Sequence, residues 1–179
     1  MFPKIRKEPT LTNNTKIFPT CEYELYFDGC SKGNPGPSGI GAVLYKKREE
    51  IWGNCQFLGD KRTNNEAEYC ALIMGLEQAI DLNIKFLSVY GDSLLVINQV
   101  KGIYKVKKLS LIPLFDKIMS LKSKFEFIEF THVYRDKNSR ADELANLALE
   151  IVKKDDQSDL ISLNEDWDQE SVINKLLNH

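Results

Sequence analysis

The sequence predicts an α/β domain built on one five-stranded mixed sheet that is flanked by helices. Two observations support this. Strand-like and helix-like segments follow one another in the order β-β-β-α-β-α-α-β-α. Short connections between the first three strands favour antiparallel pairing, and the later strands alternate with helices, as in parallel units. The 179 residues suit one domain with short tails, and 42% hydrophobic residues suffice for a core without disulfides or a structural metal.

The first three strands are predicted from the alternation of side chains. Residues 22–27 alternate polar and apolar side chains, the pattern of a half-buried strand. Two further strand-like runs cover 40–45 and 51–58, separated by a charged turn at 46–50. The segment 33–39 is rich in glycine and proline, so we expect a turn or loop there.

The later elements alternate between helix and strand. A long helix is expected to begin after Thr63, because Thr63-Asn64-Asn65-Glu66 is a capping-box pattern; Asn65-x-x-Glu68 offers a second register. The elements after it are a strand at 84–90, a helix at 94–99, a helix at 109–121, a strand at 125–133 and a helix at 139–154.

The charge is distributed unevenly along the chain. The formal net charge of −2 gives by itself no sign of a nucleic-acid-binding protein. Residues 1–20 carry a net +3 and residues 155–179 a net −6, which leaves +1 for 21–154. We therefore expect a basic N-terminal extension over 1–20, a folded domain over 21–154, and an acidic C-terminal tail over 155–179 with a short helix at 168–178.

The composition also indicates in which cellular compartment the protein is expected. The first residues are charged and lack an apolar run, which argues against a secretory signal. No stretch reaches the roughly 18 apolar residues of a membrane span, so no membrane partner is expected. The cysteines have no close pairing that would indicate a zinc site. We expect an intracellular protein in a reducing compartment, the cytoplasm or the nucleus. The cysteines are Cys21, Cys30, Cys55 and Cys70.

Four carboxylates lie at the ends of predicted elements. Each has an ordinary explanation as a helix cap or turn residue. Gathered in one cleft, they would repel one another unless a cation lay among them, and carboxylates suit Mg²⁺ or Mn²⁺. Two such ions point to phosphoryl chemistry. The acids are Asp28 closing the first strand, Glu68 in the first turn of the long helix, Asp92 after the fourth strand and Asp142 in the first turn of the last helix.

The segments around these acids resemble the four blocks of type 1 ribonuclease H, in order and spacing, over 21–152. The resemblance implies the ribonuclease H fold, with three antiparallel strands first. It also implies cleavage of the RNA strand of an RNA–DNA hybrid, leaving 5′-phosphate and 3′-hydroxyl ends. The blocks are Asp28-Gly29-x4-Asn34-Pro35-Gly36-Pro37-x-Gly39, Thr63-Asn64-Asn65-x-x-Glu68, Gly91-Asp92-Ser93 and His132-x9-Asp142-Glu143-Leu144-Ala145.

The resemblance implies a role for each acid in a site with two Mg²⁺ or Mn²⁺ ions. Asp28 would touch both ions. Asp142 would hold the ion that activates water, and Glu68 and Asp92 the ion near the leaving 3′-oxygen. His132 matches a mobile histidine that assists proton movement or product release, whereas without the resemblance a surface histidine at a strand end is the favoured interpretation.

The resemblance also indicates residues that bind the nucleic acid. Asn34, Asn64 and Asn65 match contact positions, and amides can both donate to and accept from a 2′-hydroxyl. Helix capping is an alternative role for Asn64 and Asn65. Ser31 adjoins these amides, and Thr63 and Ser93 match positions that grip the strands.

The basic segment 101–108 is a further candidate contact. Its lysines lie around Tyr104, and basic residues interleaved with an aromatic suit contact with a phosphate backbone, although a solvated loop is the alternative. The candidate contacts are Lys105, Lys107 and Lys108.

The chain departs from the best-known bacterial pattern, which inserts a basic helix where this sequence has only 101–108. It is nearer to archaeal, plant and other forms without that helix, which often carry a His-Val-x-Arg run like His132-Val133-Tyr134-Arg135. Arg135 is therefore a candidate substrate contact. Some of those relatives also accept double-stranded RNA as a substrate. We expect this protein to be a monomer.

Two other interpretations compete with the nuclease. A catalytically silent hybrid-binding module on the same fold would not need four acids and His132. A Holliday-junction resolvase or an integrase is disfavoured by the Asn-Pro-Gly-Pro, Thr-Asn-Asn and Ala-Asp-Glu-Leu-Ala blocks.

Overall fold

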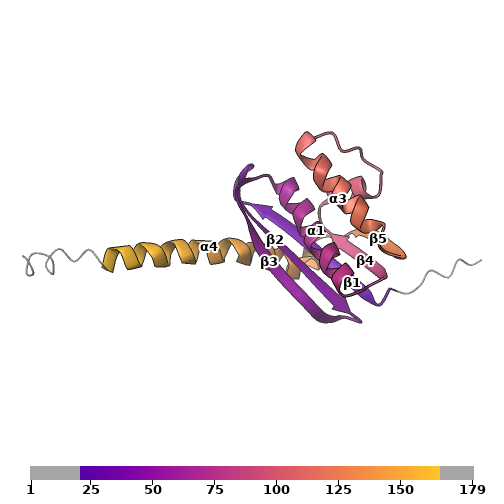
Figure 1. The fold of residues 1–179 in the computed structure, drawn as a ribbon, viewed down its shortest axis with the longest axis horizontal. Helices are drawn as coiled ribbons and strands as arrows, with labels where there is room; N and C mark the ends of the chain where they lie inside the picture. The colour runs from indigo at the N-terminus through magenta and orange to yellow at the C-terminus, as the bar shows by residue number, and fades with distance from the viewer. Residues whose placement is uncertain (1–20, 166–179) are drawn as a thin grey trace, which may run out of the picture.

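The computed structural model describes the backbone of residues 21–165 and the side chains of residues 21–152. A five-stranded sheet forms its centre, with strand order β3-β2-β1-β4-β5 (Figure 1). The first three strands pair antiparallel, β4 runs parallel to β1, and β5 runs parallel to β4. The predicted mixed sheet is confirmed. The strands are β1 (Tyr23–Ser31), β2 (Gly36–Lys46), β3 (Glu49–Arg62), β4 (Phe86–Gly91) and β5 (Phe127–His132).

Helices cover both faces of the sheet (Figure 1). The main core lies under α1 and contains fully buried side chains such as Leu25, Phe27, Leu72 and Leu76. A smaller cluster that includes Val43 lies under α4 on the other face. The helices are α1 (Asn64–Asp81), α2 (Leu94–Val100), α3 (Ile112–Lys122) and α4 (Ser139–Glu165), and two short 3₁₀ turns are η1 (Leu109–Leu111) and η2 (Arg135–Lys137).

Glycines let the helices approach the sheet backbone closely. A Cβ atom on Gly29 would lie 2.3 Å from the backbone nitrogen of Glu68 in α1, and one on Gly41 would lie 2.4 Å from the carbonyl oxygen of Ala141 in α4. Real Cβ atoms do not come so close to another backbone. The two contacts therefore bring α1 and α4, each with one candidate acid, against opposite faces of β1 and β2.

The boundaries of β1 and β2 near the predicted loop differ from the sequence-based expectation. β2 begins at Gly36, so residues 36–39 belong to a strand and not to the loop predicted over 33–39. They pair with β1, which continues to Ser31, and Asp28 consequently lies inside β1 instead of closing it. Backbone pairing across β1 and β2 outweighs the local preference of glycine and proline for turns.

The last helix also differs, because α4 continues to Glu165 beyond the predicted end at residue 154. The apolar stripe that set the prediction ends at Val152, but helical hydrogen bonding does not require a buried face. The predicted N-terminal extension (1–20) and short helix (168–178) lie outside the described residues. Between α2 and α3 the chain forms only the turn η1, as expected for a form without the basic helix. None of the described helices could cross a membrane.

Candidate active site

Three of the four candidate acids converge at the C-terminal ends of β1 and β4. One carboxylate oxygen each from Asp28, Glu68 and Asp92 lie within 4.8 Å of one another. Asp28 and Glu68 are each only 5% exposed. Carboxylates from a strand, a helix and a strand-end loop thus share a single small volume.

A capping box fixes the start of α1 and with it the position of Glu68. The Thr63 hydroxyl accepts a hydrogen bond from the Glu66 amide at 3.4 Å, and the Glu66 carboxylate accepts one from the Thr63 amide at 2.9 Å. Of the two predicted registers, the first is therefore correct, and Glu68 lies in the second turn of α1, not in the first as predicted. Capping does not account for Glu68.

Capping does not account for Asp92 either. Ser93 is the N-cap of α2, where its hydroxyl accepts a hydrogen bond from the Val96 amide at 3.5 Å. The Asp92 carboxylate instead accepts a hydrogen bond from the Asn138 side-chain amide at 3.1 Å. It is held toward the other two acids by a side chain of the η2–α4 junction.

The electrostatics of the cluster favour bound positive charge. Burial, and then the charges of Asp92 and Asp142, raise the pKa of Asp28 from 3.8 to about 7. Burial, followed by the charges of Asp28 and Asp92, raises the pKa of Glu68 well above its usual value. One carboxylate oxygen of Glu68 is buried without a hydrogen-bond partner. Buried acids with these properties can ionise together when a cation lies among them.

Asp142 lies at the edge of this group, in the first turn of α4 as predicted. Its charge still raises the pKa of Asp28, so the four acids form one electrostatic unit. The Asp142 carboxylate accepts a hydrogen bond from the guanidinium of Arg135, with which it forms an ion pair. Arg135, predicted as a substrate contact, thus places a positive charge directly beside an acid of the cluster.

Asn138 was not predicted, although it connects the elements that carry the acids. It is 1% exposed, and its side-chain amide donates to the carbonyl of Phe27 at 2.9 Å as well as to Asp92. Its backbone carbonyl accepts from the Asp142 amide at 3.1 Å. A single asparagine in a polar segment gives no periodic signal; only its place four residues before Asp142 hinted at a role.

We expect Asn138→Ala to weaken the site without unfolding the domain. The loss of two buried hydrogen bonds should lower the free energy of unfolding by about 1–3 kcal/mol. A freed Asp92 should lower the affinity for divalent ions about 10–100-fold. Denaturant unfolding and a Mg²⁺ titration would measure the two effects. Asn146→Ala is the control, because within residues 21–152 the Asn146 amide donates only to the Asp142 carbonyl; equal Mg²⁺ affinities in the two variants would contradict the assigned role.

His132 lies at the end of β5, beside the cluster. Its Nε2 is 3.1 Å from the backbone oxygen of Asp92, and its ring meets that of Tyr134 edge-on at 5.9 Å between centroids. The ring is partly exposed. The His132 ring therefore contacts the backbone of a candidate metal ligand, Asp92, and also remains accessible to solvent.

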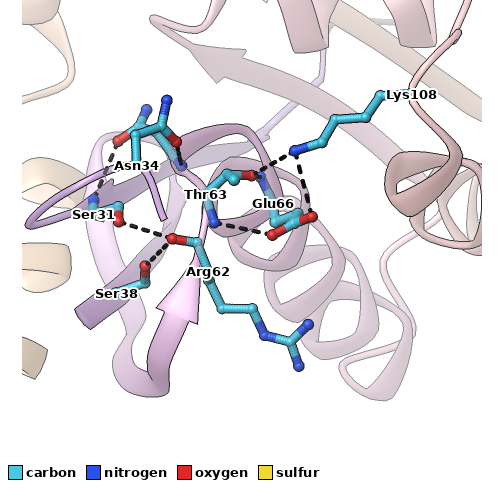
Figure 2. A network of polar contacts seen from close by, with 8 residues as sticks. Ser31, Asn34, Ser38, Arg62, Thr63, Glu66 and Lys108 are labelled. Atoms are coloured by element: carbon cyan, nitrogen blue, oxygen red, sulfur yellow. Dashed lines mark hydrogen bonds and ion pairs between the residues drawn. The ribbon is translucent and has the colours of Figure 1, made fainter. Parts of the chain in front are cut away.

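The candidate contacts in the first two blocks form a network of hydrogen bonds (Figure 2). The Ser31 amide donates to the Asn64 side chain at 3.2 Å, and the Asn64 amide donates to the Asn34 side chain at 3.2 Å. The Ser31 hydroxyl donates to the carbonyl of Arg62 at 2.9 Å. The three residues, which come from separate segments, are thus brought together, and Asn65 lies partly exposed in the next position of α1.

The three candidate lysines are in different environments. The Lys108 ammonium donates to the Thr63 hydroxyl at 3.2 Å and lies 3.6 Å from the Glu66 carboxylate (Figure 2). Lys105 and Lys107 are exposed. Lys108 therefore ties the basic segment to the capping box of α1, a contact that the sequence pattern did not indicate.

The sequence is similar to known proteins across this domain. The model of a family described as reverse transcriptase-like matches residues 26–148. Ribonuclease HI of Halobacterium salinarum is 40% identical over 125 residues, which are 70% of this chain and 63% of that protein. Ribonuclease H of Trichodesmium erythraeum is 35% identical over 142 residues, covering 69% of this chain and 86% of that protein. The bifunctional protein Rv2228c of Mycobacterium tuberculosis is 39% identical over 134 residues, but this chain covers only 36% of its length.

Solved structures share the fold. The N-terminal RNase H domain of Rv2228c, determined as a fusion with maltose-binding protein, has a TM-score of 0.71 at 38% identity, covering 74% of this chain and 96% of that one. LC11-RNase H1 in complex with an RNA/DNA hybrid has a TM-score of 0.68 at 37% identity, covering 73% and 98%. By sequence and by fold, the chain belongs to the reverse transcriptase-like family and, within it, to the type 1 ribonucleases H.

Proposed function

We propose that this protein is an endoribonuclease that hydrolyses the RNA strand of RNA–DNA hybrids and leaves 5′-phosphate and 3′-hydroxyl ends. The convergence of Asp28, Glu68 and Asp92 in one buried volume is the observation that supports this most. A domain that only binds nucleic acid gains nothing from buried, mutually repelling carboxylates, which lower its stability. Relatives named ribonuclease H, one of them solved with an RNA/DNA hybrid, support the same activity.

The donor set fits hard divalent ions. It offers only carboxylate oxygens, including an unpartnered oxygen of Glu68, and no histidine or thiolate within the tight group. Such ligands suit Mg²⁺ or Mn²⁺ more than zinc. Two ions held by Asp28, Glu68, Asp92 and Asp142 would supply an activated water and stabilise the charge that develops on the leaving 3′-oxygen.

In this proposal the other residues orient the substrate and move protons. Asn34, Asn64 and Asn65 offer amides to the 2′-hydroxyls of the RNA strand, which distinguish RNA from DNA. Three side-chain hydroxyls are proposed to contact the nucleic-acid strands as well, those of Ser31, Thr63 and Ser93. Arg135, paired with Asp142, offers its remaining N–H groups to a phosphate.

His132 is proposed to carry a proton during turnover or product release. We expect His132→Ala to slow turnover by about 10²-fold without abolishing it, the usual contribution of a general acid or base. Steady-state cleavage of a labelled RNA–DNA hybrid measures the turnover. Tyr134→Ala, which removes only the neighbouring ring, is the control. Unchanged turnover in His132→Ala would remove this residue from the mechanism.

The exposed lysines of 101–108 are proposed to contact the phosphate backbone. Replacing Lys105 and Lys107 with Gln should weaken hybrid binding and reduce the slope of log Kd against log salt by about 1–2, because each lost phosphate contact releases one counterion fewer. Lys108→Gln should change the slope less, since Glu66 and Thr63 already hold this ammonium. Fluorescence anisotropy across a salt series measures both, and an unchanged slope in the double variant would show that the segment is no contact.

We further propose that the protein acts as a monomer in a reducing intracellular compartment. All four cysteines are free thiols. This fits a compartment where thiols stay reduced.

One assay tests the activity and the substrate class together. Labelled RNA–DNA hybrid, double-stranded RNA and single-stranded RNA are incubated with Mg²⁺ or Mn²⁺, and Asp28→Asn serves as the inactive control. We expect cleavage of the hybrid alone or of the hybrid and double-stranded RNA, only with a divalent ion. Binding of the hybrid without cleavage would favour a silent hybrid-binding module.

A further inference from the structure

A hollow lies on the α1 face of the sheet, over strands β2 and β3. Its volume is about 430 Å³, and half-buried apolar side chains line it, among them Trp52, Leu58, Ile73 and Met74. Two acids, Glu77 and Asp81, line the part along the C-terminal half of α1. Glu77 is paired with Lys117 of α3 at 2.8 Å, whereas Asp81 makes no ion pair with any residue from 21 to 152. The groove therefore has a mainly apolar floor, interrupted by the exposed amides of Asn54 and Gln56 on β3, and an acidic end.

The acidic end of the groove lies near residue 21, the first residue that the structure describes. α1 runs antiparallel to β1, because Ala67 and Glu68 lie against Gly29 whereas Gly75 lies against Leu25. The C-terminal residues of α1, including Asp81, therefore lie near the start of β1.

The strand register places Trp52 toward the same end. Trp52 pairs with Leu44, and Leu44 pairs with Leu25 on the next strand. The carbonyl of Glu22 accepts a hydrogen bond from the amide of Lys47, in the turn between β2 and β3, at 2.9 Å. The chain thus enters the sheet beside the β2–β3 hairpin. Two strand spacings, about 10 Å, separate β1 from β3, a distance that three or four extended residues cover.

The segment before this point has the matching chemistry. Residues 1–20 carry a net +3, and Lys16, Ile17 and Phe18 come within five positions of Cys21. A cation followed by two apolar side chains complements an acidic end and an apolar floor. The C-terminal segment 155–179 carries a net −6, and its residues 155–165 continue α4, which packs on the opposite face of the sheet. Its charge would be repelled by Glu77 and Asp81.

We propose that the groove is a docking site for the N-terminal segment of the same chain, with Ile17 and Phe18 covering Trp52 and Lys16 beside Asp81. The docked segment would extend the core over strand β3, which forms the edge of the sheet. This inference is independent of the proposed nuclease activity.

The fluorescence of Trp52 tests the proposal in the full chain. The chain has two tryptophans, so Trp167→Phe leaves Trp52 as the single reporter. In that background, the double change Ile17→Ser and Phe18→Ser should shift Trp52 emission to the red, increase its quenching by acrylamide and lower the thermal midpoint by about 2–4 °C. Val172→Ser with Leu176→Ser is the matched control in the C-terminal segment and should change none of these.

A charge exchange tests the proposed orientation. Lys16→Glu and Asp81→Lys should each increase the quenching of Trp52, and the two together should restore the original value. Unchanged emission and quenching after Ile17→Ser and Phe18→Ser would overturn the proposal. A response to the C-terminal control variant, or a dependence of the quenching on protein concentration, would also overturn it, in favour of the tail or of a second copy of the chain.

Discussion

Replacing Asp28 with Asn is expected to reduce hybrid cleavage by on the order of 10³-fold or more, since a metal ion stabilises the transition state by several kcal/mol. The substitution keeps the shape of the side chain. It removes a carboxylate that lies within the tight group of three and whose pKa is also raised by the charge of Asp142. Single-turnover cleavage of a labelled hybrid in Mg²⁺ measures the loss. Wild-type activity in this variant would contradict the assignment of the site.

The same substitution should stabilise the metal-free protein. Burial and the neighbouring charges raise the pKa of Asp28 from 3.8 to about 7 in the folded state. Between these values the folded protein holds a proton that the unfolded chain releases, so the contribution of this carboxyl to stability falls as the pH rises through that window. The asparagine side chain carries no charge, and the stability advantage of the Asp28→Asn variant should be small near pH 4 and largest above pH 7.

Metal ions should reverse this order. Added Mg²⁺ neutralises the acids of the wild type and should raise its thermal midpoint, because a ligand that binds only the folded state stabilises it. The Asp28→Asn variant, with one ligand fewer, should gain less. Thermal unfolding in a chelator and in Mg²⁺, at pH 5 and pH 8, gives the four values needed for each protein. If the Asp28→Asn variant is no more stable than the wild type in chelator at pH 8, the acids do not repel one another as the structure indicates.

Much of this arrangement could be predicted because local signals agreed with the tertiary structure. The capping box at Thr63 and Glu66 fixed the start of α1, and the helical period then put Glu68 on the buried side. Asp92 was predicted at the end of a buried strand, where ligand sites form in open sheets. These positions follow from short-range rules, and the structure brings them together as the resemblance implied.

The contacts that hold the acids in place could not be predicted in this way. Asn138 bonds to Phe27, 111 residues earlier in the chain, and to Asp92, 46 residues earlier. Lys108 reaches Thr63 across 45 residues. Such contacts depend on the relative placement of separate elements, for which a single sequence carries no periodic signal. The same limit explains the error at 36–39, where pairing with β1 outweighs the turn preference of glycine and proline.

Gly29→Ala is expected to disrupt both the fold and the site. A Cβ atom at this position would lie 2.2 Å from the carbonyl carbon of Ala67 and 2.3 Å from the nitrogen of Glu68, both backbone atoms of α1. A helix backbone cannot move aside as a side chain can, so α1 must shift from β1. We expect the free energy of unfolding to fall by about 3 kcal/mol or more, at the upper end of the cost of overpacking.

The shift should reach the catalytic group directly, because the colliding residue carries a candidate metal ligand. Moving Glu68 by about 1 Å from Asp28 should lower the cleavage rate about 10²-fold even in the fraction that remains folded. Gly53→Ala is the matched control, since a Cβ there would come too close only to the flexible side-chain end of Glu50, at 2.8 Å, and would lie at an ordinary contact distance of 3.6 Å from the Leu144 side chain. Urea unfolding gives the stability, and cleavage at low temperature, normalised to the folded fraction, gives the activity. In this interpretation, the close packing of α1 on Gly29 is also what brings Glu68 near Asp28, so stability and activity should fall together. A Gly29→Ala protein that is stable but inactive, or unstable but fully active, would contradict this link.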